Sequence, residues 1–369
     1  MKIVNVSIDA YSAPHASPIS NGKYTYATTD IVVVSISTDE GLTGHGWTHG
    51  TRVVIDTLLS LKERVIGEDP FNVERIWEKM YLPKIYGRKG FETRAISAVD
   101  IALWDIIGKA AGRPVRQMLG GYRDCVPAYI AGGYYGRDKN HDGLRAEMRA
   151  NLAGGAKAVK MKIGAASIAE DVERIDAVRE VIGPDVKLMV DANNAYNRLD
   201  ALRMGRELDR RNIYWFEEPL HPEDLEGSAE LCRRLDTPIA AGENEYTRWG
   251  FRQLIEGGAA QIINADAQVL GGITEWKKVA DIAMAAHVMI APHGDQEIHT
   301  HLVSAVPNGL IVEYYDNNTN SLLRDMFPGH IRLNADGCVR VPDRPGLGVE
   351  IDFEAARKYR YFTDRDFDR

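Results

Sequence analysis

The first part of the chain alternates between apolar and polar residues. The alternating apolar positions are Val4, Val6, Ile8, Val32, Val34 and Ile36. This period of two predicts strands with one buried face, and the turn signal Asp39-Glu40-Gly41 predicts a hairpin within a small antiparallel sheet. The intervening residues 13–25 are polar and contain proline and glycine, so we expect a loop there.

A helical pattern follows the sheet. From about Thr93 to Ala111 the apolar residues recur every three or four positions, and Gly112 and Pro114 are stop signals. The apolar stripe consists of Ile96, Val99, Leu103, Ile106 and Ala110. This spacing predicts one long amphipathic helix.

From residue 126 onward, short β-branched runs alternate with amphipathic stretches such as 168–182 and 272–286. The expected strands are 126–130, 158–163, 187–191, 213–217, 238–243, 261–264, 288–293 and 310–313. Strand–helix units that repeat about every 25 residues predict an α/β fold, a (β/α)8 TIM-type barrel, rather than an open doubly wound sheet. Residues from about 333 onward cannot add another unit, and we expect them to pack back onto the N-terminal domain.

The composition argues against several classes of protein. The chain has 369 residues and a formal net charge of -8, which provides no basic surface for nucleic acid or an anionic membrane. No apolar run approaches the roughly 20 residues of a membrane span, and the N-terminus alternates like a strand rather than a signal peptide. Cys125, Cys232 and Cys338 are scattered, predict no disulfide framework or Cys-x-x-Cys metal site, and fit a cytoplasmic protein.

Ionisable residues recur at one point of the repeat, at or just past the carboxyl end of a strand. They are Lys162, Asp191, Glu217, Glu243, Asp266, His293 and Glu313. In a barrel all these strand ends face one mouth, where functional groups gather. We therefore predict a site at this mouth.

Three acids, Asp191, Glu217 and Glu243, come from consecutive strands. Adjacent parallel strands lie about 4.8 Å apart, so the carboxylates would repel one another and raise each other's pKa. A hard divalent cation resolves this conflict, and oxygen ligands suit Mg²⁺, with Mn²⁺ as a substitute. The alternative is that these are ordinary loop acids paired with arginine or solvent.

Basic residues complete the predicted site. Lys160 and Lys162 face the same side of one strand, and two close ammonium groups lower each other's pKa toward the range of a general base. His293 needs a partner that fixes its tautomer, and Asp266, one strand earlier, is placed to be that partner. The alternatives are salt bridges to the neighbouring acids for the lysines and a structural role for the histidine.

The motifs at these strand ends occur in a fixed order. They are Lys160-x-Lys162, Asp191-x-Asn193, Trp215-Phe216-Glu217-Glu218-Pro219, Gly242-Glu243-Asn244, Asp266, Gly271-Gly272-Ile273-Thr274, His293 and Glu313. This set resembles the enolase superfamily, more narrowly its mandelate racemase/muconate lactonizing enzyme-like subgroup, which includes many acid-sugar dehydratases. The resemblance covers nearly the whole chain. It implies an α+β capping domain (1–125), a catalytic barrel (126–332) in eightfold or modified (β/α)7β form, and a C-terminal segment (333–369) that returns to the capping domain.

The resemblance also implies roles for the residues at the mouth. The three acids would bind one Mg²⁺ ion per active site, and the ion would hold the substrate carboxylate and stabilise an enediolate. Lys162, with Lys160 supporting the charge, would be the base on one face. His293, oriented by Asp266, would act on the opposite face.

Further contacts to the substrate follow from the same resemblance and from the polar loops. A protonated Glu313 would donate a hydrogen bond to the substrate carboxylate, and Asn193 would contact the 2-hydroxyl. The loop residues that we expect to line the site are His15, Lys23, Tyr24, Trp47 and His49. We expect the loops 13–28 and 47–52 to close over the substrate.

This polar lining suits a hydroxyl-rich substrate, so we expect a small-molecule sugar acid to be dehydrated to a 2-keto-3-deoxy acid. The alternatives are a racemase, epimerase or cycloisomerase of a hydroxy acid and, more remotely, a barrel that binds metal and acid without turnover. Relatives of this kind are commonly homo-oligomers, which we expect here too. Asp295 and Glu297, which follow His293, have no assigned role.

Overall fold

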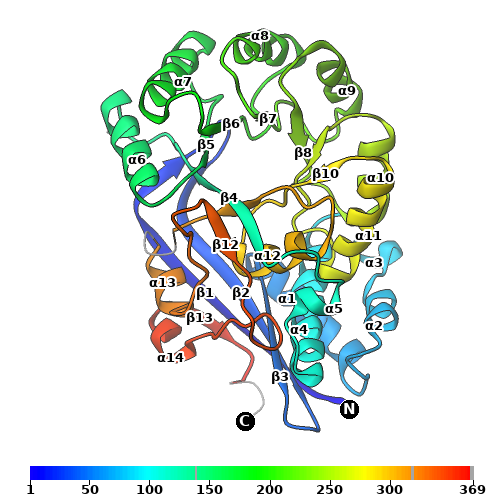
Figure 1. Cartoon of the computed structure of the whole chain (residues 1–369). Coiled ribbons are helices and arrows are strands. Elements are labelled where there is room, and N and C mark those ends of the chain that lie inside the picture. The colour runs from blue at the N-terminus through cyan, green and yellow to red at the C-terminus, as the bar shows by residue number, and fades with distance from the viewer. Residues whose placement is uncertain (138, 317–319, 366–369) are drawn as a thin grey trace.

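The chain folds into a small antiparallel sheet with its helices and a larger parallel sheet that curls into a barrel (Figure 1). The structure is a computed structural model that describes residues 1–137, 139–316 and 320–365. The small sheet lies below the barrel in the view of Figure 1, and both ends of the chain belong to this lower part.

The small sheet pairs strands from the two ends of the chain. Its members are β1 (Ile3–Ser20), β2 (Thr25–Thr38), β3 (Thr43–His49) and β13 (Arg360–Thr363), in the antiparallel order β13-β1-β2-β3. The helices that follow β3 are α1 (Arg52–Val65), α2 (Val73–Met80), α3 (Pro83–Tyr86), α4 (Phe91–Ala111) and α5 (Val115–Met118). We call this sheet and these helices the cap. The predicted helix over 93–111 is confirmed as α4.

The β1–β2 hairpin is longer than the sequence pattern predicts. Residues 13–25, expected to form a loop, are mostly strand, and the pairing extends to Ser20 opposite Thr25. The register shifts between Pro14 and Ile19, and proline cannot donate to the ladder. The expectation of a loop was wrong because a ladder needs only backbone groups, and this extension is largely exposed, so no apolar alternation marks it.

Helix α4 packs closely on the cap sheet. A Cβ atom at Gly44 would lie 2.3 Å from the carbonyl oxygen of Ala102, and one at Gly46 would lie 2.1 Å from that of Ala98. Only glycine allows the helix backbone to approach β3 this closely. The cap therefore has a rigid layer of helix on sheet beside the barrel.

The predicted barrel strands are all present and parallel. They are β4 (Cys125–Gly132), β5 (Ala158–Lys162), β6 (Lys187–Asp191), β7 (Trp215–Glu217), β8 (Ile239–Ala241), β9 (Ile262–Ile263), β10 (Met289–Ile290) and β11 (Val312–Tyr314), in the order β10-β9-β8-β7-β6-β5-β4-β11. A bridge between Ile290 and Gly309 closes the ring: Leu310 N donates to Ile290 O at 2.8 Å, and Ile290 N donates to Asn308 O at 2.9 Å. The sheet is thus a barrel, and the open doubly wound alternative is wrong.

A helix returns the chain from each of the strands β4 to β10 to the next strand. These helices are α6 (His141–Ala153), α7 (Ile168–Ile182), α8 (Arg198–Asp209), α9 (Leu225–Arg234), α10 (Thr247–Glu256), α11 (Gly272–Ala285) and α12 (Gln296–Ala305). The last strand, β11, is followed instead by the short α13 (Ser321–Met326), which lies beside the cap (Figure 1). Over the described residues the barrel therefore has the modified (β/α)7β form.

The C-terminal segment contacts both parts of the molecule. Its strand β12 (Cys338–Arg340) pairs with β4, and after α14 (Phe353–Ala356) and the 3-10 turn η2 (Arg357–Tyr359) the chain adds β13 to the edge of β1. The register of β12 brings two cysteines together: donor atoms of Cys125, Asp336 and Cys338 all lie within 4.8 Å of one another. The three cysteines are free, and Cys125 and Cys338, although far apart in the sequence, lie close together in the fold.

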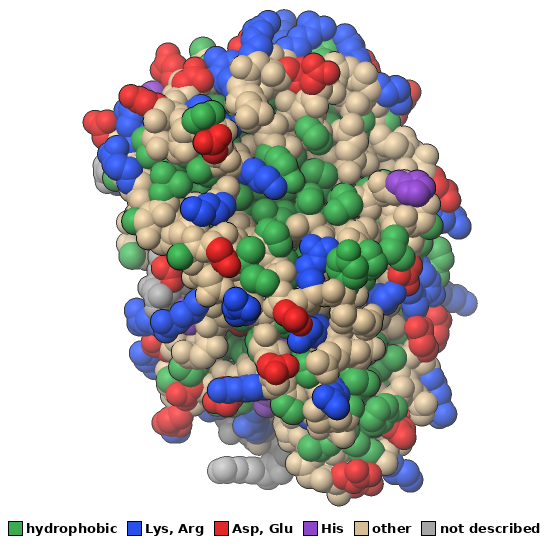
Figure 2. Space-filling model, viewed as in Figure 1, with side chains coloured by type: hydrophobic (Ala, Val, Ile, Leu, Met, Phe, Trp, Pro, Cys, Tyr) green, Lys and Arg blue, Asp and Glu red, His purple; other side chains and the backbone are tan. Residues whose placement is uncertain are grey.

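The surface carries charges of both signs. On the face in Figure 2, Lys and Arg side chains are interspersed with Asp and Glu side chains. Within the described part of the chain, no helix combines the length and apolar character needed to span a membrane.

Candidate active site

The register of the barrel strands places the predicted site residues at one level of the mouth. Lys162 at the end of β5 is the partner of Asp191 on β6, which is in turn the partner of Glu217 on β7. Glu243 follows β8 after Gly242, whose positive φ of 135° is accessible mainly to glycine. Parallel pairing in register therefore gathers side chains that lie 26 to 29 residues apart in the chain.

The three acids form a compact donor set. One carboxylate oxygen from each of Asp191, Glu217 and Glu243 lies within 4.8 Å of the other two. Asp191 and Glu217 are fully buried, and burial raises the pKa of Glu217 even though the ammonium group of Lys160 opposes the rise. Glu243 Oε2 is buried and has no hydrogen-bond partner.

These features fit a divalent cation. A set of three oxygen donors with an unpartnered carboxylate oxygen is the chemistry that Mg²⁺ prefers, and the cation would offset the mutual repulsion of the acids. Asn193 supports the set from the next loop, because its backbone N donates to Asp191 Oδ1 at 2.9 Å and its Nδ2 donates to Glu243 Oε1 at 3.4 Å. Its own Oδ1 is buried and has no hydrogen-bond partner among the described residues.

The two lysines are ion-paired to this donor set. Lys160 Nζ lies 2.8 Å from Glu217 Oε1 and 2.8 Å from Glu313 Oε1, and Lys162 Nζ lies 2.5 Å from Asp191 Oδ2. Burial alone lowers the pKa of both lysines, but the carboxylates outweigh it and raise both above the usual range. The charge of Lys160 does lower the pKa of Lys162, as expected, but the nearby acids outweigh it, so the expected net shift toward the range of a general base is wrong for this structure.

The histidine and its partner lie at the other end of the donor set. His293 Nδ1 lies 3.0 Å from Asp266 Oδ2, and His293 Nε2 lies 3.6 Å from Glu243 Oε2. Burial lowers the pKa of His293, but the charge of Glu243 and the bond to Asp266 raise it well above 6.5. Lys162 therefore contacts the first acid of the set and His293 the last, so the two flank the space between them.

Glu313 differs from the expectation of a protonated donor. Its carboxylate accepts three contacts, from Gly294 N at 2.7 Å, Lys160 Nζ at 2.8 Å and Tyr315 OH at 3.1 Å. Burial would raise the pKa of Glu313, but the positive charges of Lys160 and His293 hold it well below its usual range. These contacts favour the ionised carboxylate of Glu313, which forms an ion pair with Lys160.

The predicted loop residues fall into two groups. His15 contacts Thr29 Oγ1 at 3.3 Å on the cap sheet, and Lys23 and Tyr24 are exposed at the tip of the β1–β2 hairpin. His49 is exposed at the end of β3, and its Nδ1 lies 3.2 Å from the carbonyl oxygen of Asp30. The structure describes these four side chains at the hairpin and the end of β3, none of them within hydrogen-bond distance of the acids.

Trp47 differs from the other loop residues. It is 1% exposed, and its Nε1 donates to Asp295 Oδ2 at 2.5 Å, so the indole is part of the cap–barrel boundary rather than an open contact. The other unassigned acid, Glu297, turns away from the mouth and accepts Ile331 N at 3.0 Å. Burial raises the pKa of Glu297 to about 8, consistent with its lack of a basic partner.

The β1–β2 hairpin reaches the mouth of the barrel (Figure 1). Ser20 and Tyr135 exchange backbone hydrogen bonds of 3.0 and 2.9 Å. At the tip, a Cβ atom on Gly22 would lie 2.4 Å from Ala192 O and 2.7 Å from Ile163 O, so the backbone of the turn touches two loops of the mouth. The segment 13–28, expected to be a loop that covers the substrate, is thus part of a β-hairpin whose tip packs against the mouth of the barrel.

Three tyrosines near Lys160 or Lys162 were not predicted. The Lys162 ammonium group lies 5.3 Å from the centre of the Tyr134 ring, and Tyr315 OH donates to Glu313. Burial raises the pKa of Tyr26, and the charges of Lys162 and Glu243 also act on it, which places this cap residue beside the mouth. Tyr134 and Tyr315 follow strand ends and could have been found by the rule that found the acids, whereas nothing in the sequence marks Tyr26.

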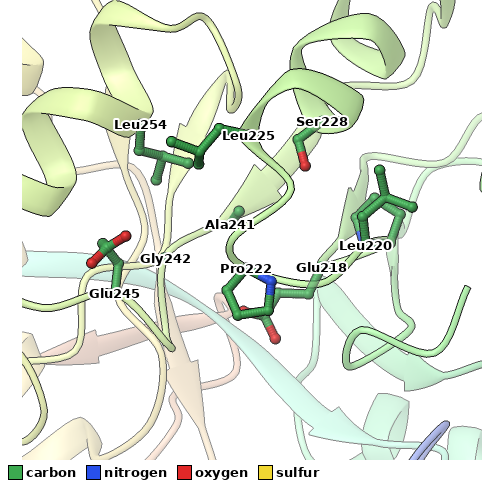
Figure 3. Close-up of a pocket in the computed structure, with 10 residues that line it drawn as sticks. Glu218, Leu220, Pro222, Leu225, Ser228, Ala241, Gly242, Glu245 and Leu254 are labelled. Atoms are coloured by element: carbon green, nitrogen blue, oxygen red, sulfur yellow. The ribbon is translucent and has the colours of Figure 1, made fainter. Parts of the chain in front are cut away.

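A separate cleft lies behind the donor set, between α9 and α10 (Figure 3). Its lining consists of Glu218, Pro219, Leu220, Pro222, Leu225, Ser228, Ala241, Gly242, Glu245 and Leu254. Glu218 follows a metal-site acid but points away from it and accepts Asn244 Nδ2 at 2.9 Å. The cleft is mostly apolar and lacks the basic groups of the mouth, so the mouth is the better candidate for chemistry.

The barrel, the cap and the donor set define a class of barrel enzyme with a divalent-cation site at the mouth. The chain belongs to the mandelate racemase / muconate lactonizing enzyme family of the enolase superfamily. Residues 3–120 match the N-terminal domain of that family, and residues 143–356 match the enolase C-terminal domain-like family. The predicted membership and fold are confirmed.

Characterised relatives span almost the entire chain. Arabinonate dehydratase of Saccharolobus solfataricus is 39% identical, over 90% of this chain and 91% of the relative. The 3,6-anhydro-alpha-L-galactonate cycloisomerase of Streptomyces coelicolor is 35% identical, over 95% and 98%. A crystal structure of L-talarate/galactarate dehydratase from Salmonella typhimurium, liganded with Mg and L-lyxarohydroxamate, superposes with a TM-score of 0.92 at 33% identity, covering 98% of this chain and 93% of that one. The chain is accordingly an enzyme of the metal-dependent lyase or isomerase type, and the alternative of a barrel without turnover is set aside.

Proposed function

We propose that the protein catalyses the Mg²⁺-dependent dehydration of a sugar acid to a 2-keto-3-deoxy acid. The observation that carries the proposal is the placement of Lys162 and His293 at opposite ends of one carboxylate set. A base and an acid on two sides of a bound carboxylate are what an elimination across C2 and C3 requires. Several relatives are sugar-acid dehydratases, which supports the same assignment.

The side chains divide the reaction between them. When bound to Asp191, Glu217 and Glu243, Mg²⁺ supplies positive charge that stabilises negative charge on the substrate carboxylate. Because Asp191 is both a cation ligand and the ion-pair partner of Lys162, positive charge at the acids favours the neutral amine. The C2–H bond breaks, and its proton passes to Lys162 Nζ.

The leaving group departs on the other side. The C3–O bond breaks while His293 Nε2 donates a proton to the hydroxyl, which leaves as water, and the resulting enol becomes the 2-keto acid. Asp266 keeps the proton on Nδ1 and thus fixes the tautomer of the ring. Asn193 binds the 2-hydroxyl, and its unpartnered Oδ1 supports that role. Glu313 keeps Lys160 charged and in place.

The alternative is isomerisation by the same residues. A relative that is 35% identical is a cycloisomerase, and a second, the D-galactarolactone cycloisomerase of Agrobacterium fabrum, is 34% identical. In an isomerase the proton would be returned to carbon, or an internal oxygen would be the leaving group, so that no water is released.

Several finer features belong to the same proposal. We propose one Mg²⁺ ion per site with Mn²⁺ as a substitute, a homo-oligomer in the cytoplasm, and the division 1–125, 126–332 and 333–369 into capping domain, barrel and returning segment. His15, Lys23, Tyr24 and His49 are proposed to contact the distal part of the substrate. Trp47 is also expected to contact the substrate, but its Nε1 donates to Asp295 Oδ2, so we do not include it in the proposed set.

The test follows each of a panel of sugar acids by proton NMR in D₂O with Mg²⁺. Loss of the 2-proton together with a 3-deoxy-2-keto product would support dehydration and identify the substrate. Exchange or a new isomer without that product would assign an isomerase instead. Lys162→Ala and His293→Asn are run alongside, and unchanged turnover in Lys162→Ala would contradict the mechanism.

A further inference from the structure

The pair formed by Asp266 and His293 spans two different barrel units. Asp266 lies in the loop between β9 and α11, and His293 lies in the loop between β10 and α12. Their 3.0 Å contact therefore depends on how these two loops sit relative to each other. Nothing in either strand alone fixes that distance.

A single stretch of the cap bonds to both loops. Trp47 Nε1 donates to Asp295 Oδ2 at 2.5 Å, whereas Trp47 O accepts Gln268 Nε2 at 3.1 Å. The next residue, Thr48, donates from Oγ1 to Gln268 O at 2.8 Å. The two barrel partners stand in equivalent places, because each lies two residues after a member of the Asp266–His293 pair.

Each barrel partner also holds its own loop. Gln268 N donates to Asp266 Oδ1 at 2.7 Å, and Asp295 Oδ1 accepts Glu297 N at 2.9 Å at the start of α12. The side chains of Trp47, Thr48 and Gln268 are at most 1% exposed, so water cannot replace these bonds if they break. The Trp47 ring also packs on Phe327 with ring centres 5.2 Å apart.

We infer that Trp47 is a positioning residue, which acts with Asp295 and Gln268 to hold the Asp266 and His293 loops at their working separation. The cap thus contributes to the chemistry through the barrel and not only by covering the substrate. This inference rests on the proposed role of His293 as the acid. It predicts that breaking the bonds of Trp47 to Asp295 and Gln268 impairs the step at C3 more than the step at C2, because Lys162 lies on the other side of the acids.

The variant that tests this is Trp47→Phe, which removes the N–H and keeps an aromatic ring against Phe327. The matched control is Trp104→Phe, since Trp104 Nε1 donates from α4 to Thr274 Oγ1 at 2.9 Å and also joins cap to barrel. With the Mg²⁺-loaded enzyme, 2-proton exchange in D₂O and keto-acid formation are measured for the same substrate. We expect Trp47→Phe to lower kcat for product about tenfold or more, with exchange and KM changed much less, and Trp104→Phe to leave the ratio of the two rates unchanged.

Two further measurements separate this inference from the proposed function. The proton NMR signal of the His293 Nδ1–H, assigned with His293→Asn, should shift or broaden in Trp47→Phe and Asp295→Ala but not in Trp104→Phe, whatever reaction the enzyme performs. The double variant Trp47→Phe/Asp295→Ala should be no worse than Asp295→Ala alone, because Asp295→Ala already removes the bond that Trp47→Phe removes. An unchanged signal in Trp47→Phe, or equal loss of exchange and product, would overturn the inference. Full turnover in His293→Asn would overturn the acid role, leaving the NMR test of positioning intact.

Discussion

Lys160 is a cation with no exposed surface, surrounded by Glu217, Glu313 and Asp191. Lys160→Met would leave these carboxylates buried without their counter-ion. We expect the free energy of unfolding without Mg²⁺ to fall by about 3–5 kcal/mol, the usual cost of breaking a buried ion pair. Urea unfolding in the presence of a chelator measures this free energy. Added Mg²⁺ should recover part of the loss because it restores positive charge at Glu217.

Lys187→Met is the control for that substitution. Lys187 is exposed on β6, and its ammonium group lies 4.4 Å from the centre of the Tyr214 ring. An equal loss in the two variants would mean that the charges around Lys160 do not matter for stability.

His301 makes the stability of the folded protein depend on pH in mild acid. Burial lowers its pKa to about 4, and the ring accepts Arg116 N at 3.3 Å while bonding Leu347 O at 2.9 Å, so there is no room for a second proton. The unfolded state protonates the His301 ring at a higher pH than the folded state does. The contribution of His301 to stability is therefore fully present above pH 6.5 and decreases as the pH falls toward 4. We expect His301→Gln to reduce that slope by up to about 1.4 kcal/mol per pH unit. Denaturant titrations between pH 4 and 7, with the exposed His221→Gln as control, would reveal an unchanged slope if this is wrong.

At the level of single residues, the sequence predicted the positions better than the ionisation states. The strand-end rule located Lys162, Asp191 and His293 because side chains after parallel strands must converge. The expected protonation of Glu313 is disfavoured by Gly294, which follows the preceding strand β10, and by Lys160, which comes from a part of the chain far from Glu313. A count of nearby charges requires the folded geometry.

The β1–β2 hairpin is one of the cap elements that touch the mouth, together with β3. Gly22→Ala would place a methyl group 2.4 Å from Ala192 O, which is too close for real atoms, so the tip must lift. We expect KM to rise about tenfold with little change in the melting temperature, because the tip is a small part of the cap core. Initial-rate kinetics measure this.

Gly136→Ala serves as the control for the hairpin, since a Cβ atom there would meet only Lys139 Cβ, at an ordinary 3.5 Å. If Gly22→Ala keeps the KM of the parent protein, the hairpin does not shape substrate binding.

Helices and strands were predictable from the sequence where one of their faces is buried in the core. All barrel strands were found because β-branched runs end at turn signals, and α4 was found from its apolar stripe. The hairpin between Pro14 and Thr25 was missed because its exposed residues carry no alternation. The closeness of Cys125 and Cys338 was also invisible, since it depends on β12 pairing with β4.

At the scale of the whole molecule, the C-terminal segment ties the cap together. Asp364 is 3% exposed, accepts Ile8 N at 2.8 Å and pairs with Lys62 Nζ at 2.8 Å. Asp364→Ala would leave a buried donor on β1 and an unpaired lysine on α1. We expect the free energy of unfolding to fall by about 2–4 kcal/mol, against no measurable change for the exposed Asp343→Ala.

Urea unfolding measures this change in the free energy of unfolding, and hydrogen exchange then distinguishes a local loss of stability from a global one. Hydrogen exchange should show β1 amides exchanging faster in Asp364→Ala while barrel amides stay protected. Uniform acceleration in both parts would contradict a local role for the segment.

The pairing of β13 with β1 has a consequence for synthesis on the ribosome. The edge of β1 is completed by residues 360–363, which are synthesised only after all the strands of the barrel. While the chain grows, that edge presents open backbone groups that invite pairing with other nascent chains. All barrel strands are present once residue 314 has emerged, but the cap sheet cannot be completed until residues 360–363 have followed, so products truncated between these points would carry a barrel beneath an unfinished, aggregation-prone cap.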